Sequence, residues 1–405
     1  MSLSVSPDVL LDLYRAAVAA VGGRESVRAV LRADESNEPV SVIAIGKAAS
    51  AMLAGAQDAL GPRLRQALLI TKHKHADKHS QRDARVTVIE AGHPWPDQTS
   101  LVAGQRLLAF LRGLSRPPLF LLSGGASSLV EVPVSGVGLA QLRALNTYLL
   151  SSGFDIRSIN RVRQAVSQIK GGRLTHFLPP GRTQALLISD VPGDDPAIIG
   201  SGLLAAPLQG AMPSLPPELA AVCAHPAAPA DPERLAAVDL RLVATNAYAL
   251  DAIEARAARL GLPVRRHRRF VADEAVAGAR IIANQLLAEP GYVHLWGGEP
   301  VVRLPAEPGR GGRMQSLALS AAQYLHGHAQ AYLLAAGTDG TDGPGDAAGA
   351  LVDNGTWERA TTAGMMPAEA LRRADAGTAL AASGDLIRTG PTGTNVMDLM
   401  IGYCA

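Results

Sequence analysis

Residues 335–346, AAGTDGTDGPGD, place three aspartates among glycines and threonines directly after an apolar run. Their spacing does not fit the EF-hand pattern of acids around a central glycine, which argues against a calcium loop of that type. The alternative is that a strand at 332–336 delivers the carboxylates to its end, where they hold Mg2+ against a phosphate or accept a proton. Asp339 is therefore a candidate metal ligand.

A second glycine-rich segment, SGGASS at 123–128, follows the apolar run 119–122. Glycine lets successive backbone amides point into one concavity, and amides at a helix N-terminus attract anions. A tight strand-to-helix turn requires the same residue types, so a purely structural role remains an alternative. The segment matches neither G-x-G-x-x-G nor G-x-x-x-x-G-K-S/T, so the chain shows no dinucleotide fingerprint and no Walker loop here.

Two cations open predicted helices. Lys47 follows Gly46 at a strand-to-helix junction, and Arg313 follows a glycine pair before a helical pattern. A cation at the positive end of a helix is unfavourable unless an anion lies there too, so an anionic ligand such as a phosphate is one explanation. For Lys47 the alternative is a solvated surface side chain. Lys170 and Arg173 flank another glycine pair, where a helix C-cap explains them equally well.

The segment SDVPGDD at 189–195 ends another apolar run with three acids. Carboxylates at the end of a strand can hold Mg2+ or act as a general base, and Asp190 is the better placed for this. Asp194 and Asp195 also fit the cap of a helix.

Apolar runs followed by glycine-rich turns and helical patterns recur along the chain, which predicts an α/β fold with a parallel sheet covered on both faces. Ligands of such sheets bind outside the carboxyl ends of the strands, where these turns emerge. A length of 405 residues predicts two domains. We expect them at 1–235 and 236–405, with the Pro- and Ala-rich residues 203–235 as the connection.

The composition favours a globular protein, because 47% of the residues are hydrophobic and 18% are charged. A formal net charge of +2 argues against a large nucleic-acid-binding surface, and no apolar stretch is long enough to span a bilayer. Cys223 and Cys404 lie far apart, which predicts a reduced, cytoplasmic protein without structural zinc. The N-terminal residues predict an amphipathic surface helix rather than a signal peptide. A homo-oligomer is left open.

In chain order, a set of stretches resembles the glycerate 2-kinases of the two-domain type whose C-terminal half is the MOFRL domain. The matching stretches cover the whole length: AIGKAASAM (44–52), GHPWPDQTS (92–100), LLSGGASSL (121–129), INRVRQAVSQIKGGRL (159–174), LLISDVPGDDPAIIGSG (186–202), GGEP (297–300), GRGGRMQSLAL (309–319), AAGTDGTDGPGDAAGALVD (335–353) and TGPTGTNVMDLMIG (389–402).

This resemblance implies a kinase that uses ATP and Mg2+ to phosphorylate the 2-hydroxyl of D-glycerate, giving 2-phosphoglycerate, ADP and a proton. It also implies a Rossmann-like N-terminal domain, a smaller α/β C-terminal domain and an active site in the cleft between them. Lys47 and Arg313 match the catalytic cations of the family, and Asp190 and Asp339 are our candidates for metal binding or proton transfer. The candidate substrate- and nucleotide-binding residues are Gly46, Ser123, Gly124, Gly125, Ala126, Ser127, Lys170, Arg173, Asp194, Glu299, Thr338 and Asn395.

One departure from the family lies beside Arg313, where Met314 replaces the usual asparagine. Three alternatives follow. The acceptor could be a related small hydroxy acid. The chain could be an NAD(P)H-dependent hydroxypyruvate reductase, although such an enzyme predicts a G-x-G-x-x-G motif that is not found. It could also be a catalytically silent nucleotide-binding module.

Overall fold

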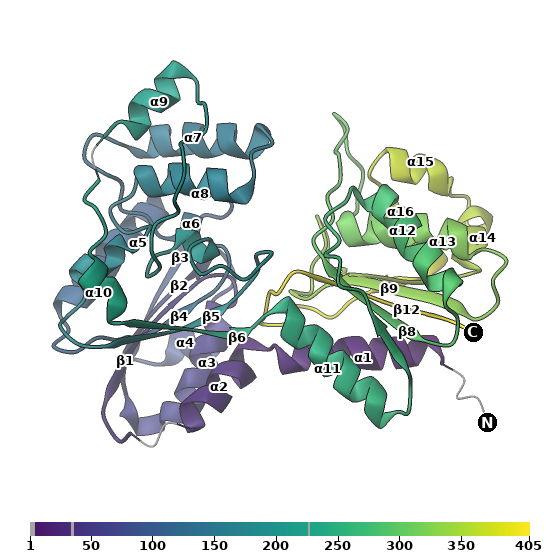
Figure 1. The fold of residues 1–405 in the computed structure, drawn as a ribbon, viewed down its shortest axis with the longest axis horizontal. Helices are drawn as coiled ribbons and strands as arrows, with labels where there is room; N and C mark the ends of the chain where they lie inside the picture. Colours follow the sequence, from purple (N-terminus) through teal and green to yellow (C-terminus); the bar gives the residue numbers. More distant parts are fainter. Residues whose placement is uncertain (1–4, 34–35, 226) are drawn as a thin grey trace. The chain divides into compact units, whose positions relative to one another are not determined.

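The computed structural model describes residues 5–33, 36–225 and 227–405. These residues form two compact units. The N-terminal unit is Gly23–Ala244, and the C-terminal unit combines Thr245–Ala405 with the segment that ends at Gly22. Figure 1 shows both units as ribbons, and each is described by itself below.

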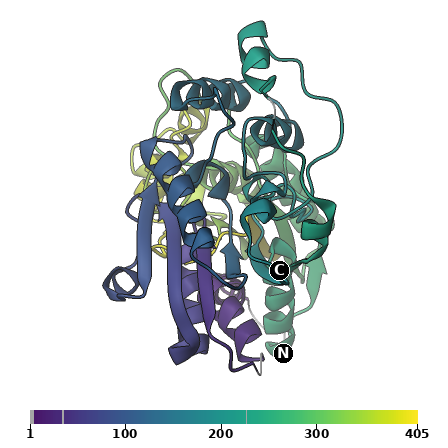
Figure 2. The same ribbon diagram turned by 90° about the vertical axis from the view of Figure 1, so that its left-hand side faces the viewer.

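The N-terminal unit is built on a six-stranded sheet in which every strand pair is parallel, in the order β3-β2-β1-β4-β5-β6. The strands are β1 (Val40–Ile45), β2 (Leu64–Lys72), β3 (Val86–Ala91), β4 (Leu119–Leu122), β5 (Thr183–Ile188) and β6 (Val238–Ala244). This is the strand order of the Rossmann fold, so the predicted Rossmann-like parallel sheet is confirmed. Figure 2 shows the purple-to-blue strands of this sheet side by side from a second direction.

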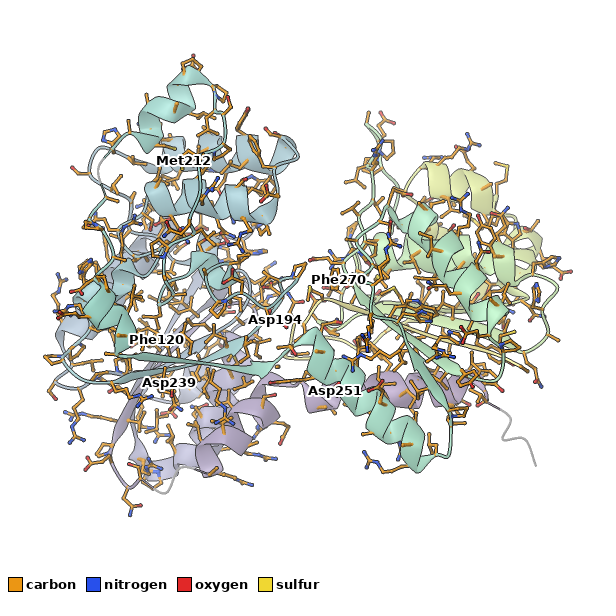
Figure 3. The ribbon with its side chains drawn as sticks, viewed as in Figure 1. Phe120, Asp194, Met212, Asp239, Asp251 and Phe270 are labelled. Atoms are coloured by element: carbon orange, nitrogen blue, oxygen red, sulfur yellow. The ribbon has the colours of Figure 1, made fainter. Side chains whose placement is uncertain are left out.

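Helices cover both faces of this sheet, with α3 on one face and α6 on the other (Figure 1). The α-helices of the unit are α2 (Gly23–Arg32), α3 (Ala49–Leu60), α4 (Lys78–Arg82), α5 (Gln98–Arg112), α6 (Ala126–Leu129), α7 (Leu139–Ser151), α8 (Ile156–Ala165), α9 (Pro217–Cys223) and α10 (Pro232–Ala236). A strand that is covered on both faces needs a continuous apolar run, and all four residues of β4 are buried. Phe120 of this strand, labelled in Figure 3, lies fully inside the core.

The strand order reverses between β1 and β4, so the loops that follow these two strands lie next to each other. Ile45 is paired with Leu122 at the last position of the two strands. Just beyond, the Ser123 N–H donates to Ile45 O at 3.0 Å and the Lys47 N–H donates to Gly124 O at 2.9 Å. The fold therefore joins the first predicted cation to the SGGASS segment.

The C-terminal unit contains a second six-stranded sheet, in the order β11-β10-β9-β12-β8-β7. Its strands are β7 (Val264–Arg266), β8 (Val293–Gly298), β9 (Ala331–Gly337), β10 (Gly349–Asp353), β11 (Leu386–Ile387) and β12 (Asp398–Cys404). Only β7 and β8 pair in parallel; the other pairs are antiparallel. β12 lies between β8 and β9, and all seven of its residues are buried.

The helices of the C-terminal unit lie on both faces of its sheet, with α1 and α11 on one face and α12 and α13 on the other (Figure 1). They are α1 (Pro7–Ala20), α11 (Asn246–Arg259), α12 (Ala275–Ala288), α13 (Arg313–Leu325), α14 (Thr356–Thr362), α15 (Pro367–Arg372) and α16 (Ala376–Ser383). The two-domain α/β fold is thus confirmed. In the described part of the chain, no helix combines the length and apolarity needed to cross a membrane.

The N-terminal helix belongs to the C-terminal unit, whereas the sequence predicted it in a domain at 1–235. α1 buries Leu10, Leu13 and Tyr14, and the Tyr14 hydroxyl donates to Gly337 O in β9 at 2.6 Å. The helix is amphipathic, as predicted, and its apolar face is buried against the C-terminal unit. Its partner lies more than 300 residues away, so local sequence pattern gave no sign of it.

The Pro- and Ala-rich residues 203–235 also differ from the expected interdomain connection. They contain α9 and all of α10 except its last residue, and they lie between β5 and β6, which are neighbours in one parallel sheet. After α1, the chain returns to the C-terminal unit only beyond β6, between Ala244 and Thr245. Composition indicated an irregular segment correctly, but a strand that returns to the first sheet follows it.

Candidate active site

The loop after β1 is held against the loop after β4 by close contacts that need glycine. Gly46 has φ +134°, and a Cβ there would overlap the Ser123 side chain and backbone. The Ser123 hydroxyl oxygen accepts a hydrogen bond from the Ala48 N–H at 3.1 Å. The Lys47 side chain is thereby placed at the carboxyl edge of the sheet, next to the SGGASS loop.

Asp190 reaches the same edge from the loop after β5. Its Oδ2 lies 3.8 Å from Lys47 Nζ, and the two side chains are 18% and 22% exposed. A Cβ at Gly124 would overlap this carboxylate, so only glycine lets Asp190 pack directly on the β4 loop. The structure thus brings together an ammonium group and a carboxylate that solvent, and therefore a small ligand, can reach.

The start of α6 presents unpaired backbone amides beside this pair. The N–H groups of Gly124, Gly125, Ala126 and Ser127 donate no hydrogen bond to any residue that the structure describes. Gly125 has φ +87°, and a Cβ at this position would lie 3.1 Å from Lys47 Cγ. Successive amides of this kind form a cradle for an anion.

Further cations surround the loop. Desolvation, together with the charges of Lys47, Lys72 and Arg163, lowers the pKa of His93, so its imidazole is neutral at pH 7. The charges of Lys47, Lys72 and Arg163 are thus felt together at His93, beside the Asp190 carboxylate. Cations gathered in this way attract anionic substrates.

In the C-terminal unit, Arg313 opens α13, as predicted, but protein carboxylates surround it. Its Nε donates to Asp398 Oδ2 at 2.6 Å and its Nη2 to Asp398 Oδ1 at 3.2 Å, while Nη1 lies 3.1 Å from Glu299 Oε1. The anion that the sequence analysis required at this helix end is therefore supplied at least in part by the protein itself. The Arg313 side chain is still 35% exposed and is held in one orientation.

Asp342 caps the same helix. Gly312 stands at the N-cap position without a side chain, and the Asp342 carboxylate instead accepts hydrogen bonds from the Met314 N–H at 3.1 Å and the Gln315 N–H at 2.7 Å. Burial raises the pKa of Asp342 above its ordinary value. The second acid of the 335–346 segment is thus a structural residue.

The other predicted residues of this segment have different environments. The Thr338 hydroxyl donates to Met397 O at 2.7 Å and accepts from the Val396 N–H at 2.8 Å, so it ties two loops together. Asp339 is only partly buried, and its Oδ1 accepts from the N–H and the hydroxyl of Thr341, both at 3.0 Å. Asn395 is buried, and it directly precedes Val396, whose N–H donates to the Thr338 hydroxyl.

Comparisons with known proteins decide the family. A model of a domain of unknown function, DUF4147, matches residues 9–211, and a model of the MOFRL family matches residues 292–398. D-glycerate 2-kinase from Thermotoga maritima is 37% identical over 380 residues, which cover 90% of each chain. The chain belongs to the glycerate 2-kinase family. The resemblance inferred from the sequence motifs is thereby confirmed.

Other similar proteins support the glycerate 2-kinase fold, and one of them bears the name of the alternative function, a hydroxypyruvate reductase. The crystal structure of glycerate kinase from Thermotoga maritima matches with a TM-score of 0.86 and 33% identity, over 98% of this chain and 99% of that one. A relative from Agrobacterium vitis, 38% identical over 379 residues that cover 88% of this chain and 97% of its own, is named provisionally as a hydroxypyruvate reductase.

Two cations predicted for the glycerate 2-kinase site are engaged in internal contacts. Lys170 is buried, and its ammonium group pairs with the Glu131 carboxylate. Arg173 donates to the backbone carbonyls of Gln164 at 2.7 Å and Lys170 at 3.0 Å. Both side chains thus have structural partners, but Lys170 forms a buried ion pair rather than the helix C-cap that was the alternative, because α8 ends at Ala165.

Asp194, labelled in Figure 3, has φ +55°, and its buried Oδ1 accepts no hydrogen bond in the described structure. A helix-cap role for Asp194 explains neither its positive φ nor the lack of a donor to its Oδ1. Its neighbour Asp195 does accept from the Ala197 N–H at 3.0 Å, as a turn or cap residue would.

Three residues that lie near Lys47 or Arg313 were not predicted from the sequence: His93, Arg163 and Asp398. All three lie inside the stretches that carry the family resemblance, at 92–100, 159–174 and 389–402. Their residue types were therefore available, but nothing in local spacing linked them to Lys47 or Arg313. Met314, the departure from the family, is fully buried in the core around α13, so its side chain packs rather than orients Arg313.

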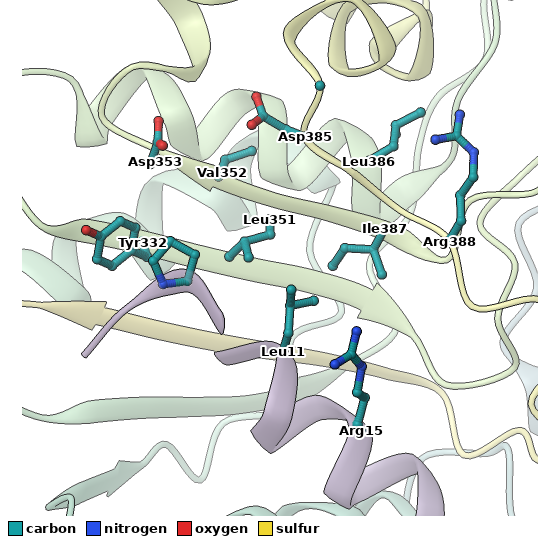
Figure 4. A pocket seen from close by; sticks show the side chains of 12 residues that line it. Leu11, Arg15, Tyr332, Leu351, Val352, Asp353, Asp385, Leu386, Ile387 and Arg388 are labelled. Atoms are coloured by element: carbon teal, nitrogen blue, oxygen red, sulfur yellow. The ribbon is translucent and has the colours of Figure 1, made fainter. Parts of the chain in front are cut away.

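A pocket of about 360 Å3 in the C-terminal unit lies apart from these residues (Figure 4). It lies between α1 and the strands β10 and β11, with Arg15 and Arg388 toward the right of the view and Asp353 toward the left. None of the predicted site residues lines it. Its position in the fold therefore does not support it as the glycerate 2-kinase site.

The Arg313–Asp398 pair gives a stability prediction. Burial raises the pKa of Asp398 to about 6, although Arg313 opposes this, and the ordinary value is 3.8. Because the folded state binds the proton more tightly, this group's contribution to stability is full below pH 4 and is lost as the pH rises through 6. The stability of wild type relative to Asp398→Asn should fall by about 2 kcal/mol between pH 4.5 and 7.5.

Urea unfolding followed by circular dichroism at both pH values measures this difference. If the advantage of wild type instead grows with pH, ion pairing with Arg313 outweighs burial and the carboxylate titrates below its ordinary range.

Proposed function

We propose that this protein is a kinase that uses ATP and Mg2+ to transfer a phosphoryl group to the 2-hydroxyl of D-glycerate. The observation that carries the proposal is the Lys47–Asp190 pair beside the unpaired amides of residues 124–127. Phosphoryl transfer depends almost entirely on positioning and on neutralising charge, and this edge of the sheet offers groups for both. The relative named D-glycerate 2-kinase supports the choice of acceptor.

Lys47 and the amides of the SGGASS loop are assigned to the phosphoryl group. During transfer, negative charge spreads over the phosphoryl oxygens, and a fixed ammonium group with convergent N–H donors stabilises that charge without reorganising. The contacts of Gly46, Ser123 and Gly124 hold Lys47 in place before substrate arrives. Fixed geometry of this kind lowers the barrier.

Asp190 is assigned to the acceptor hydroxyl. A carboxylate accepts the proton as the hydroxyl oxygen attacks phosphorus, which leaves 2-phosphoglycerate and ADP. Its position over Gly124 and near Lys47 Nζ supports this role, because the base and the phosphoryl-binding cation must lie close together. Arg313 keeps the role of second catalytic cation that the family resemblance implies, with Asp398 and Glu299 fixing its guanidinium group.

The proposed Mg2+ requires one or two carboxylates together with phosphate oxygens. Asp339 fits, since it is partly exposed and only its Oδ1 accepts hydrogen bonds from the described residues. Within the described ranges, no three His, Cys, Asp or Glu side chains gather as a metal site. When bound, Mg2+ would neutralise charge on the nucleotide phosphates.

Asp339→Asn tests this assignment. The Mg2+ concentration for half-maximal activity should rise at least about tenfold, because a neutral amide oxygen replaces a charged ligand. Asp346→Asn is the control, since that exposed acid pairs with Arg388 on the surface. A Mg2+ titration of Asp339→Asn that coincides with wild type would remove Asp339 from the metal site.

The reductase remains the second candidate because of the provisional name of one relative and the Rossmann strand order of the first sheet. A dinucleotide-binding fold of this order carries G-x-G-x-x-G after β1. Here the turn after β1 reads Gly46-Lys47-Ala48, so Ala48 stands in place of the second glycine, the one that lets the backbone approach a pyrophosphate. This favours phosphoryl transfer over hydride transfer.

One assay separates the two functions. Purified protein is incubated with ATP and Mg2+ and, in parallel, with NADH or NADPH, while D-glycerate, L-glycerate, hydroxypyruvate and related hydroxy acids are scanned. ADP release with D-glycerate and no cofactor oxidation with hydroxypyruvate are expected. Oxidation of NADH or NADPH by hydroxypyruvate without ADP release would replace the kinase with the reductase.

A further inference from the structure

Arg163 lies on α8, in the same cluster of charges as Lys47, and is held by neutral groups. Its Nε donates to Asn146 Oδ1 at 2.9 Å and its Nη1 to Ser127 Oγ at 3.3 Å. The Asn146 amide is itself fixed, because its Nδ2 donates to Leu142 O at 2.9 Å on α7. The guanidinium group is therefore oriented by the end of the SGGASS loop and by a neighbouring helix.

The charge of Arg163 is not matched by the protein. Among the residues that the structure describes, its side chain forms no ion pair. The carboxylate in its vicinity is Glu131, which pairs with Lys170 and also accepts from the Ser167 hydroxyl at 2.6 Å and the Val132 N–H at 3.0 Å. Two cations thus share one carboxylate in a desolvated region, and burial lowers the pKa of Arg163 to about 10.

Part of the guanidinium group stays open to a ligand. The Arg163 side chain is mostly covered but not fully buried, and its Nη2 donates to no described residue. A cation that is largely desolvated, held rigidly and left with free donors is suited to binding an anion that arrives from solution.

We propose that Arg163 binds the carboxylate of the hydroxy-acid substrate, with Ser127 and Asn146 holding its guanidinium group. This assignment rests on the proposed kinase function and names the residue that recognises the acid. The planar, two-pronged donor geometry of arginine matches a carboxylate, whereas Lys47 and the amides of residues 124–127 are a point charge and a cradle suited to a phosphoryl group. Since Gly125 lies against both Lys47 and His93, a carboxylate bound next to Ser127 lies near the phosphoryl-binding end of the same loop.

Arg163→Gln is the test, and Arg161→Gln is its control on the same helix, because Arg161 donates to the backbone of Gln209 instead. KM for D-glycerate should rise about 10- to 100-fold in Arg163→Gln, the loss expected for charged hydrogen bonds to a substrate carboxylate. The Kd for an ATP analogue, measured by calorimetry, should stay within about threefold of wild type. Thermal unfolding of all variants shows whether each is folded.

Arg163→Lys is the second variant, to be used if Arg163→Gln does not fold. Lysine keeps the positive charge but loses the two-pronged donor geometry, so KM for D-glycerate should rise by a smaller factor than in Arg163→Gln. Weaker binding of the ATP analogue with an unchanged KM for D-glycerate would overturn the proposal in favour of a phosphate site. An unchanged KM and an unchanged Kd would overturn it as well.

Direct binding of D-glycerate separates this proposal from the kinase function. Wild type that binds D-glycerate in calorimetry without releasing ADP from ATP would reject the kinase and leave the carboxylate site standing, provided that Arg163→Gln abolishes the binding. Wild type that binds none of the hydroxy acids would reject both.

Discussion

Lys47→Ala is expected to lower kcat by at least about a hundredfold, the effect typical of removing one preorganised group that stabilises charge in a transition state. Lys47 Nζ lies 3.8 Å from Asp190, and its stem packs beside Gly125, so the ammonium group is fixed where the proposed phosphoryl group must lie. Alanine removes the charge and leaves the loop hydrogen bonds of the Lys47 backbone intact. Steady-state kinetics with saturating ATP and D-glycerate measure the effect.

Lys78→Ala is the matched control, because Lys78 is an exposed lysine on α4 of the same unit. Its kcat should stay within about twofold of wild type. If Lys47→Ala retains the wild-type kcat, Lys47 has no part in the chemical step and the proposed active site must lie elsewhere.

Gly124→Ala is expected to have a similarly large effect, although it changes no charged group. The added methyl group would overlap the Asp190 carboxylate, so Asp190 must leave its position next to Lys47. Displacing a reacting group by about 1 Å can cost about a hundredfold in rate. We therefore expect kcat to fall by about that factor while KM for ATP changes little.

Gly138→Ala is the control for this substitution. Its Cβ would meet only the Gln141 side chain, at 3.6 Å, so activity should be close to wild type. Because Gly138 is the N-cap of α7 and alanine caps less well, stability should fall by at most about 1 kcal/mol. Thermal unfolding of Gly124→Ala distinguishes a displaced carboxylate from a collapsed loop. A folded Gly124→Ala protein with full activity would show that the position of Asp190 does not matter for turnover.

The part of the candidate site that sequence predicted lies where parallel strands end. The turns after β1, β4 and β5 meet at one sheet edge as a consequence of the fold, so Gly46, Lys47, Ser123, Gly124 and Asp190 come together without any information beyond strand assignment. The start of α13 at Arg313 was equally local, since a glycine pair precedes a helical pattern. These predictions depended only on neighbouring residues and strand order.

Pairings between residues that are distant in the chain could not be predicted from the sequence. Arg313 and Asp398 are 85 positions apart, Lys170 and Glu131 are 39 apart, and Tyr14 reaches Gly337 across 323. A cation at a helix start is stabilised by a nearby anion, but nothing in the local pattern indicated that Asp398 and Glu299 supply one for Arg313. The same limitation left Arg163 unnoticed, because its significance lies in the absence of a paired carboxylate among the described residues around it.

The most direct test of the central claim is the position of the phosphate in the product. Purified protein is incubated with ATP, Mg2+ and D-glycerate, and the phosphorylated product is identified by 31P and 1H NMR. We expect stoichiometric ADP and a phosphate on the 2-hydroxyl, giving 2-phosphoglycerate. Phosphate on the 3-hydroxyl would contradict the proposed function. So would a folded protein that forms no phosphorylated glycerate and that behaves like its Lys47→Ala variant.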